Sequence, residues 1–106
     1  MPPTDEVPYI LHQFTVPAGK RVISYSATAA NGGANEVVRC GVRANGTFLS
    51  AHAAQVGTQA GGTYLSTISG VTFYNSSVPY TLDLVCLHGS GSDVPYIDPG
   101  AEVAVY

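Results

Sequence analysis

Two stretches near the C-terminal end of the sequence constrain the fold more than any other part of it. In Tyr80–His88, the apolar residues Leu82, Leu84 and Cys86 fall at every second position. Side chains at every second position of a β-strand point to the same face, so this stretch predicts a strand with one apolar face. Ala101–Tyr106 alternates in the same way. Together they predict the last two strands of a β-sandwich, joined by a long polar loop.

The rest of the chain contains further segments of this kind, separated by turn residues. The expected strands are Tyr9–Val16, Arg21–Ala27, Glu36–Ala44, Thr47–Ala53, Thr63–Ser69 and Val71–Tyr74. With the two C-terminal strands they make about eight strands at intervals of roughly ten residues, without a helix. We therefore predict an all-β fold, an antiparallel β-sandwich. A jelly-roll order and an immunoglobulin-like order of the strands both fit, because strand pairing is non-local.

Turn signals set the expected ends of these strands. Asn45-Gly46 lies between two alternating runs and predicts a hairpin, because both positions of a type I′ turn need positive φ. Segments 27–34 and 54–62 are rich in alanine and glycine and are expected to form a turn and a loop. Gly70 is expected to end a strand or to mark a bulge.

A chain of 106 residues is expected to form one domain with a core of its own. Residues 1–13 are predicted to be an extended N-terminal arm, because Pro2, Pro3 and Pro8 disfavour a helix or a central strand. Residues 14–106 are predicted to be the β-sandwich. Apolar residues in and beside the arm are expected to contact other subunits: Val7, Tyr9, Ile10, Leu11 and Phe14.

The charge composition argues against two classes of partner. The chain has four basic residues and a formal net charge of −3. Four cations are too few to neutralise many phosphates, so no nucleic-acid partner is expected. No apolar run reaches the length of about 18 residues that a membrane span needs, so no membrane partner is expected either. The segment MPPTDEVP has no signal-peptide pattern, so either the protein is not exported by one or the chain begins after it.

Cys40 and Cys86 are the two cysteines of the chain, and both fall on the apolar face of an expected strand. A disulfide between them would stabilise the fold by roughly 4 kcal/mol in the chain-entropy model. The alternative is two buried free thiols, because cysteine also behaves as a small hydrophobic residue. The sequence leaves both alternatives open, since it does not show that the two strands are neighbours.

Residues with catalytic or metal-binding chemistry are scattered. His12, His52 and His88 could supply a zinc site, but none is spaced from another as neighbouring ligands usually are. The segment 89–92 contains Gly-Ser-Gly-Ser without the strand-turn-helix context of a nucleophilic serine. Asp93 and Asp98 could bind calcium in the long loop, or lie in a solvated turn. We expect no enzyme activity, no metal and no cofactor.

Two surface features suggest sugars. Asn45 and Asn75 each begin an N-glycosylation pattern that also fits plain turn chemistry. Five tyrosines could form a platform on which sugars stack, although core and cross-strand packing is the more common role of such residues. These tyrosines are Tyr9, Tyr64, Tyr74, Tyr80 and Tyr96.

The segments FTVPAG, VRCGVRANGTFL, YTLDLVCLHG and IDPGAEVAVY resemble small jelly-roll and C1q-like β-sandwich domains. Similar domains occur in bacteriophage virion surface proteins, such as decoration and fibre proteins, and in secreted actinobacterial proteins. The resemblance covers the chain from Phe14 onward as strand pattern and turn placement, without a diagnostic motif. It implies assembly with other subunits, often as trimers, and binding to a lattice, a receptor or a glycan. It assigns no functional residue.

Two functional hypotheses follow. The first is a structural virion protein, a capsid decoration or accessory (minor capsid) subunit at the virion surface. Its partners would be other protein subunits, including copies of itself, and it would dock through the arm and the sandwich. The alternative is a secreted, extracellular binding module, a lectin or adhesin, stabilised by a disulfide between Cys40 and Cys86.

Overall fold

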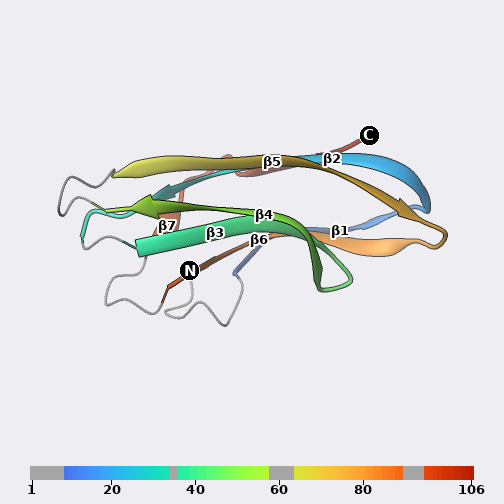
Figure 1. The fold of residues 1–106 in the computed structure, drawn as a ribbon, viewed down its shortest axis with the longest axis horizontal. Helices are drawn as coiled ribbons and strands as arrows, with labels where there is room; N and C mark the ends of the chain where they lie inside the picture. Colours follow the sequence, from blue (N-terminus) through green and yellow to red (C-terminus); the bar gives the residue numbers. More distant parts are fainter. Residues whose placement is uncertain (1–8, 34–35, 58–63, 90–94) are drawn as a thin grey trace.

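The computed structural model describes residues 9–33, 36–57, 64–89 and 95–106 and shows an antiparallel β-sandwich (Figure 1). This confirms the predicted fold class. The strands are β1 (Tyr9–Val16), β2 (Gly19–Ala30), β3 (Glu36–Ala44), β4 (Thr47–Val56), β5 (Leu65–Ser76), β6 (Tyr80–His88), β7 (Tyr96–Ile97) and β8 (Glu102–Val105). Within the described ranges no helix is long and apolar enough to cross a membrane.

The strands form two layers (Figure 1). Sheet A has the order β1-β6-β3-β4, and sheet B has the order β5-β2-β7, with β8 also paired to β2. The chain therefore changes sheet between β1 and β2, β2 and β3, β4 and β5, β5 and β6, and β6 and β7. The pairs β2–β5 and β3–β6 correspond to the B–E and C–F pairs of the immunoglobulin fold. The outermost positions differ, because β1 pairs with β6 and β8 pairs with β2.

The core lies between the sheets, and the predicted alternation places its residues there. Leu82, Leu84 and Cys86 of β6 are fully buried, as are Val38, Cys40 and Val42 of β3. Across from them, sheet B contributes Ile23, Tyr25 and the small side chains of Ala27 and Ala29. Burial of each large apolar side chain contributes about 1.5–3 kcal/mol, which makes this interleaved set the main source of stability.

The predicted hairpin is present between β3 and β4. Asn45 has φ of 49° and Gly46 has φ of 85°, as a type I′ turn requires. The turn is also tied to β6, because the Thr81 amide donates a hydrogen bond to Asn45 Oδ1 over 2.9 Å. The Asn45 side chain is therefore part of the turn.

Two segments expected to be irregular are strand instead. β2 continues to Ala30, so the predicted turn at 27–34 is wrong for residues 27–30. Ala27 and Ala29 are buried because small apolar side chains fit opposite the residues around the two cysteines. Ala30, the last residue of β2, is buried as well. Likewise β4 continues to Val56, a buried residue of the same cluster, so the predicted loop begins later than expected.

Gly70 neither ends a strand nor marks a bulge. β5 pairs with β2 without a register shift from Leu65 to Ser76. A Cβ atom at Gly70 would lie 2.5 Å from the Tyr25 hydroxyl and 2.9 Å from the His52 ring. Glycine is needed here because these two side chains occupy the space above it.

The predicted arm is in part a strand of the sandwich. β1 begins at Tyr9 and pairs with β6 along its whole length, with one register shift between Ile10 and His12. Its residues 9–13, which the predicted arm included, therefore lie in sheet A, and the predicted boundary at residue 13 falls inside β1. Residues 1–8, including Val7, lie outside the described residues.

Cys40 and Cys86 are joined by a disulfide. They stand directly opposite each other on β3 and β6, with their Cα atoms 4.1 Å apart. The bond lies within sheet A, at its centre, and both residues are fully buried. Of the two alternatives that the sequence left open, the structure therefore has the bonded one.

Candidate functional site

The edge strand β1 exposes most of its apolar side chains. Tyr9, Ile10 and Phe14 are exposed, whereas Leu11 is half-buried and packs against both parts of the core. Among the described strands, β6 alone pairs with β1, so the backbone groups on its other edge have no strand partner. Free edges with exposed apolar side chains are sites of association with other chains. β1 therefore combines two of the requirements of a docking element.

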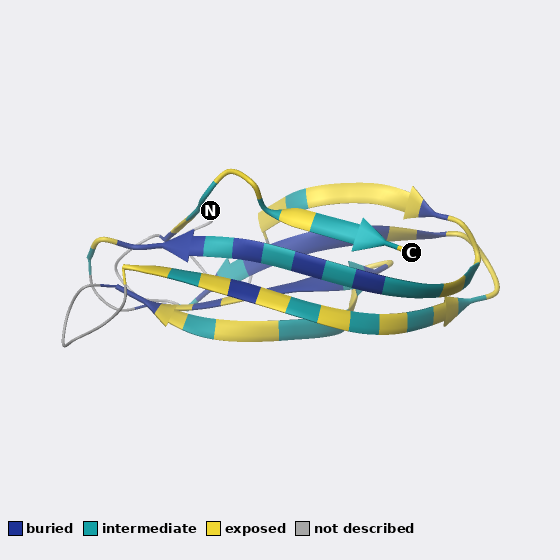
Figure 2. Ribbon diagram, turned by 90° about the horizontal axis from the view of Figure 1, so that it is seen from above, coloured by how far each residue is buried: buried dark blue, intermediate teal, exposed yellow. Residues whose placement is uncertain are grey.

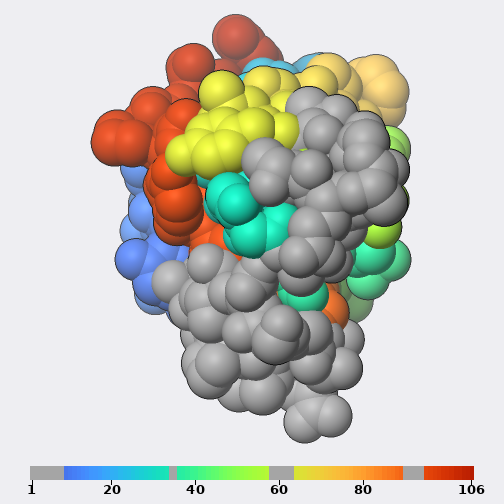
Figure 3. All heavy atoms as spheres, turned by 90° about the vertical axis from the view of Figure 1, so that its left-hand side faces the viewer, coloured from blue at the N-terminus to red at the C-terminus, as the bar shows by residue number. Residues whose placement is uncertain are grey.

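The free edge of β1 lies over the C-terminal strands of sheet B, which Figure 3 shows beside it. One hydrogen bond bridges this open side, between His12 Nε2 and the Ala101 carbonyl at 2.7 Å. Beside it is a surface hollow of about 440 Å³, lined by His12, Phe14 and residues 100–103. The opposite side of the sandwich is closed by Tyr25, whose hydroxyl lies 2.8 Å from Ser50 Oγ and whose ring stacks on His52.

A second exposed apolar surface is the outer face of sheet B, formed by β5, β2 and β8. Figure 2 looks onto this side of the molecule, where exposed positions alternate with more buried ones along β5. The exposed fractions are 77% for Phe73, 62% for Val71 and 72% for Tyr106. Such large apolar residues, side by side, are typical of surfaces that contact another macromolecule.

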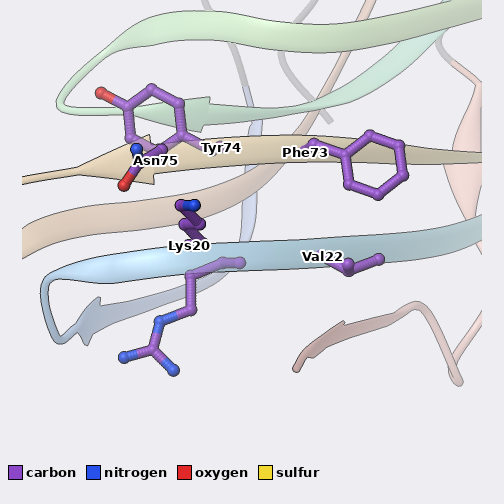
Figure 4. A pocket seen from close by; sticks show the side chains of 6 residues that line it. Lys20, Val22, Phe73, Tyr74 and Asn75 are labelled. Atoms are coloured by element: carbon purple, nitrogen blue, oxygen red, sulfur yellow. The ribbon is translucent and has the colours of Figure 1, made fainter.

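One end of this face has a shallow hollow of about 380 Å³. Figure 4 shows the side chains around it, from two neighbouring strands. Val22 and Phe73 stand opposite each other on β2 and β5, and Lys20 and Asn75 form the next outward pair. The hollow therefore has an apolar part, formed by Val22 and Phe73, and a cationic end, formed by Lys20 and Arg21.

The outer face of sheet A is different, because its central polar groups are bonded to one another. Arg43 donates two hydrogen bonds to Asp83, at 2.9 and 2.8 Å, and Gln13 Nε2 lies 3.4 Å from the same carboxylate. The hydrogen bond to Asp83 raises the pKa of Arg43 further above neutrality. The Arg43 guanidinium also lies 6.0 Å from the centre of the Phe48 ring, at cation–π distance.

The three histidines lie apart and in different settings. His12 bonds to the Ala101 carbonyl, His52 stacks on Tyr25, and His88 is buried 3.3 Å from Glu36. In the part of the chain that the structure describes, no group of three or more His, Cys, Asp or Glu side chains is placed to hold a metal ion. The structure therefore does not bring the histidines together.

The loop candidates for catalysis and calcium binding lie mostly outside the described residues. Ser90, Ser92 and Asp93 fall in the segment 90–94, which is not described. Asp98 is described, and its amide donates a hydrogen bond to the Thr28 carbonyl over 2.9 Å. That bond anchors the segment after β7 to sheet B.

The five tyrosines do not form one platform. Tyr80 is buried in the core with its ring edge-on to Tyr74, and burial raises the pKa of its hydroxyl. Tyr64 and Tyr96 are exposed at the other end of the sandwich, with their hydroxyls 2.8 Å apart. This hydrogen bond raises the pKa of Tyr96. Tyr9 lies on β1, so the predicted platform is divided among three places.

Comparison with known proteins adds no relative from which a role could be transferred. The sequence matches no protein-family model and no curated protein.

Two features of the structure were not predicted from the sequence: the Arg43–Asp83 pair and the apolar face of sheet B. The alternation of Val71 and Phe73 was the available signal for the second, but the side on which they lie depends on long-range pairing.

Both surfaces expose large apolar side chains of the described strands to solvent. β1 exposes apolar side chains and free backbone groups, which bind through burial and strand pairing. The outer face of sheet B exposes apolar side chains together with Lys20 and Glu102. The candidate site is accordingly a pair of docking surfaces: the edge strand β1 and the outer face of sheet B.

Proposed function

We propose that this protein is a non-enzymatic structural subunit of a virion, a capsid decoration or accessory subunit. It docks on neighbouring protein subunits through β1 and the segment that precedes it. The observation that supports this most is the exposure of Tyr9, Ile10 and Phe14 on a strand with a free edge.

Docking through β1 uses two interactions at once. The free backbone edge accepts a strand from a neighbouring subunit, which satisfies its amide and carbonyl groups. The apolar side chains bury against that subunit, each contributing up to about 1.5–3 kcal/mol when fully covered. Many copies attached to one lattice then hold through multivalency even where each contact is weak.

The setting at a virion surface rests on the resemblance to phage surface domains and on the disulfide. Disulfides persist on virion and cell surfaces, where reducing systems of the cytoplasm do not reach them. The Cys40–Cys86 bond lies fully buried in the middle of sheet A, so it strengthens the domain without offering a reactive thiol.

The test introduces a charge on the docking strand. Ile10→Lys and Phe14→Lys each place a charge on β1, at residues that are 46% and 38% exposed, and circular dichroism checks that each variant is folded. Particles purified from cells that make the protein should then carry several-fold fewer copies than the wild type, measured by quantitative mass spectrometry. Wild-type copy numbers in both variants would refute docking through β1.

The matched control is Val37→Lys, on the outer face of sheet A. Val37 is exposed to a similar extent, 45%, but lies on β3 instead of the free edge. It should leave the copy number unchanged. Deleting residues 1–13 is a poorer test, because it removes residues 9–13 of β1 and exposes the central strand β6.

A secreted lectin or adhesin is the second candidate, favoured by the disulfide and by the exposed Tyr64–Tyr96 pair. An exposed tyrosine offers an apolar ring face with a hydroxyl at its tip, and this combination suits contact with a sugar ring. A glycan array separates the two functions: a bound glycan, lost in Tyr96→Ala and kept in Tyr74→Phe, supports the lectin. An array without signal leaves the assembly role as the better account.

A further inference from the structure

The outer face of sheet B presents large and small side chains in two neighbouring rows. Strand register defines these rows, since residues paired across strands lie side by side. One row carries the large side chains Phe73, Val22 and Tyr106. The next outward-facing row carries the smaller side chains Val71, Ser24 and Ala104. This difference in side-chain size between neighbouring rows indicates the shape of the surface that would pack against the face.

We propose that this face binds a second copy of the same chain, with the two sheets packed face to face around a two-fold axis. The axis lies in the interface, perpendicular to the strands, and crosses β2 at Ile23. Such an axis keeps each strand opposite its own copy and exchanges the two rows. Phe73 then packs on the second copy's Val71, and Tyr106 packs on the second copy's Ala104. Large side chains meet small ones, as in well-packed sheet interfaces.

The charged residues on this face are complementary under the same two-fold axis. Lys20 and Glu102 are the charged residues that the described strands place on the outer face of sheet B. Lys20 lies three positions from Ile23 along β2, and Glu102 pairs with Ser26, three positions from it in the other direction. The two-fold axis therefore brings Lys20 to the level of the second copy's Glu102, one strand spacing of about 4.8 Å to the side. A lysine side chain spans that offset, and the contact occurs twice.

The size of the outer face of sheet B limits how tightly two copies can bind. β2 has 12 residues. An axis at Ile23 places residues 19–27 of β2 over their copies and leaves 28–30 outside the contact. With about 3.4 Å per residue and about 4.8 Å between strands, the shared area is at most roughly 31 by 14 Å. Two copies would bury about 900 Å² together, below the about 1,200 Å² at which specific interfaces begin, so the expected dimer is weak. We therefore expect a reversible dimer that forms with rising concentration. The inference does not depend on the proposed docking through β1.

Sedimentation equilibrium of the full, oxidised chain over a concentration series tests the dimer. The mass should rise from 11.0 kDa toward twice that value. Phe73→Ser should weaken dimerisation at least tenfold, because it removes the central apolar contact. Val37→Ser, on the outer face of sheet A, should have no effect. A mass of one chain at every concentration, or a trimer, would overturn the proposal, as would equal behaviour of both variants.

A charge-exchange experiment tests the geometry. Lys20→Glu and Glu102→Lys, each alone, place like charges together at both contacts and should weaken dimerisation roughly tenfold. An equimolar mixture of the two variants forms a heterodimer in which both contacts are again complementary, so it should recover wild-type association. Lack of recovery in the mixture would refute this two-fold arrangement even if the chain dimerises. Both variants lie at exposed positions, and circular dichroism confirms that they are folded.

Discussion

The outer faces of the two sheets differ in how they satisfy their own side chains. On sheet A, Asp83 is buried and bonded to Arg43, and the disulfide joins the two central strands beneath them. On sheet B, Val71 and Phe73 stand in solvent with hydroxyl-bearing residues around them. Both sheets cover the same hydrophobic core, so the core does not explain why their outer faces differ.

The comparison shows which face is stabilised by contacts within the chain itself. A buried ion pair costs desolvation and is kept only when its hydrogen bonds are complete, as they are between Arg43 and Asp83. Exposed aromatic side chains gain little from the chain that carries them and much from a partner that covers them. Sheet A therefore satisfies its central polar groups within the chain, whereas sheet B leaves large apolar side chains uncovered. We propose that this face and the edge strand β1 provide the contacts for assembly.

The largest expected effect concerns the disulfide of sheet A. The double variant Cys40→Ala/Cys86→Ala should lose about 4 kcal/mol of unfolding free energy, because the unfolded chain is no longer cross-linked. Denaturant unfolding followed by circular dichroism measures it. A loss of unfolding free energy below about 1 kcal/mol would mean that the disulfide contributes little to stability, which would contradict the proposed difference between the sheets.

The second effect is the loss of the ion pair on the same sheet. Asp83→Asn leaves the Arg43 guanidinium without its carboxylate partner. Because the Arg43 side chain is only 17% exposed, water replaces the lost hydrogen bonds poorly. We expect a loss of about 3 kcal/mol in unfolding free energy. Glu102→Gln, on the exposed face of sheet B, is the control and should change it by less than about 0.5 kcal/mol. Equal effects of the two variants would erase the distinction between the faces.

The smallest expected effect on stability is on sheet B itself. Phe73→Ser should change the unfolding free energy of the dilute, monomeric chain by less than about 0.5 kcal/mol, since 77% of the residue is exposed. The same variant should raise solubility, because it removes the largest exposed apolar group of the face. A loss above about 2 kcal/mol in thermal unfolding would show that Phe73 supports the fold from within.

Local patterns in the sequence predicted much of the fold, and non-local pairing accounts for what was missed. Glu36–Ala44 and Tyr80–His88 have the expected bounds because apolar residues recur at every second position on one face of each segment, and each ends at a turn signal. The alanines of β2 gave no such signal, since alanine is common in both turns and cores. Gly70 is explained by Tyr25, which lies opposite it in the sheet, and by His52, both distant from it in the sequence.

The docking surfaces were predicted only in part for the same reason. The apolar residues of β1 are visible in the sequence, but its pairing with β6 joins segments about 70 residues apart, too distant for any local pattern to reveal. The Arg43–Asp83 bond and the two rows on sheet B also depend on which strands become neighbours. β7 has only two residues, too few to show an alternation.

Small-angle X-ray scattering over a concentration series tests most directly whether the uncovered face of sheet B is the place of association. One chain measures 47 × 21 × 18 Å, with its longest axis along the strands. Face-to-face packing should double the scattering mass at high concentration while the longest dimension stays close to that of one chain. A mass that never rises above one chain, or a doubled mass with a much longer particle, would contradict the account.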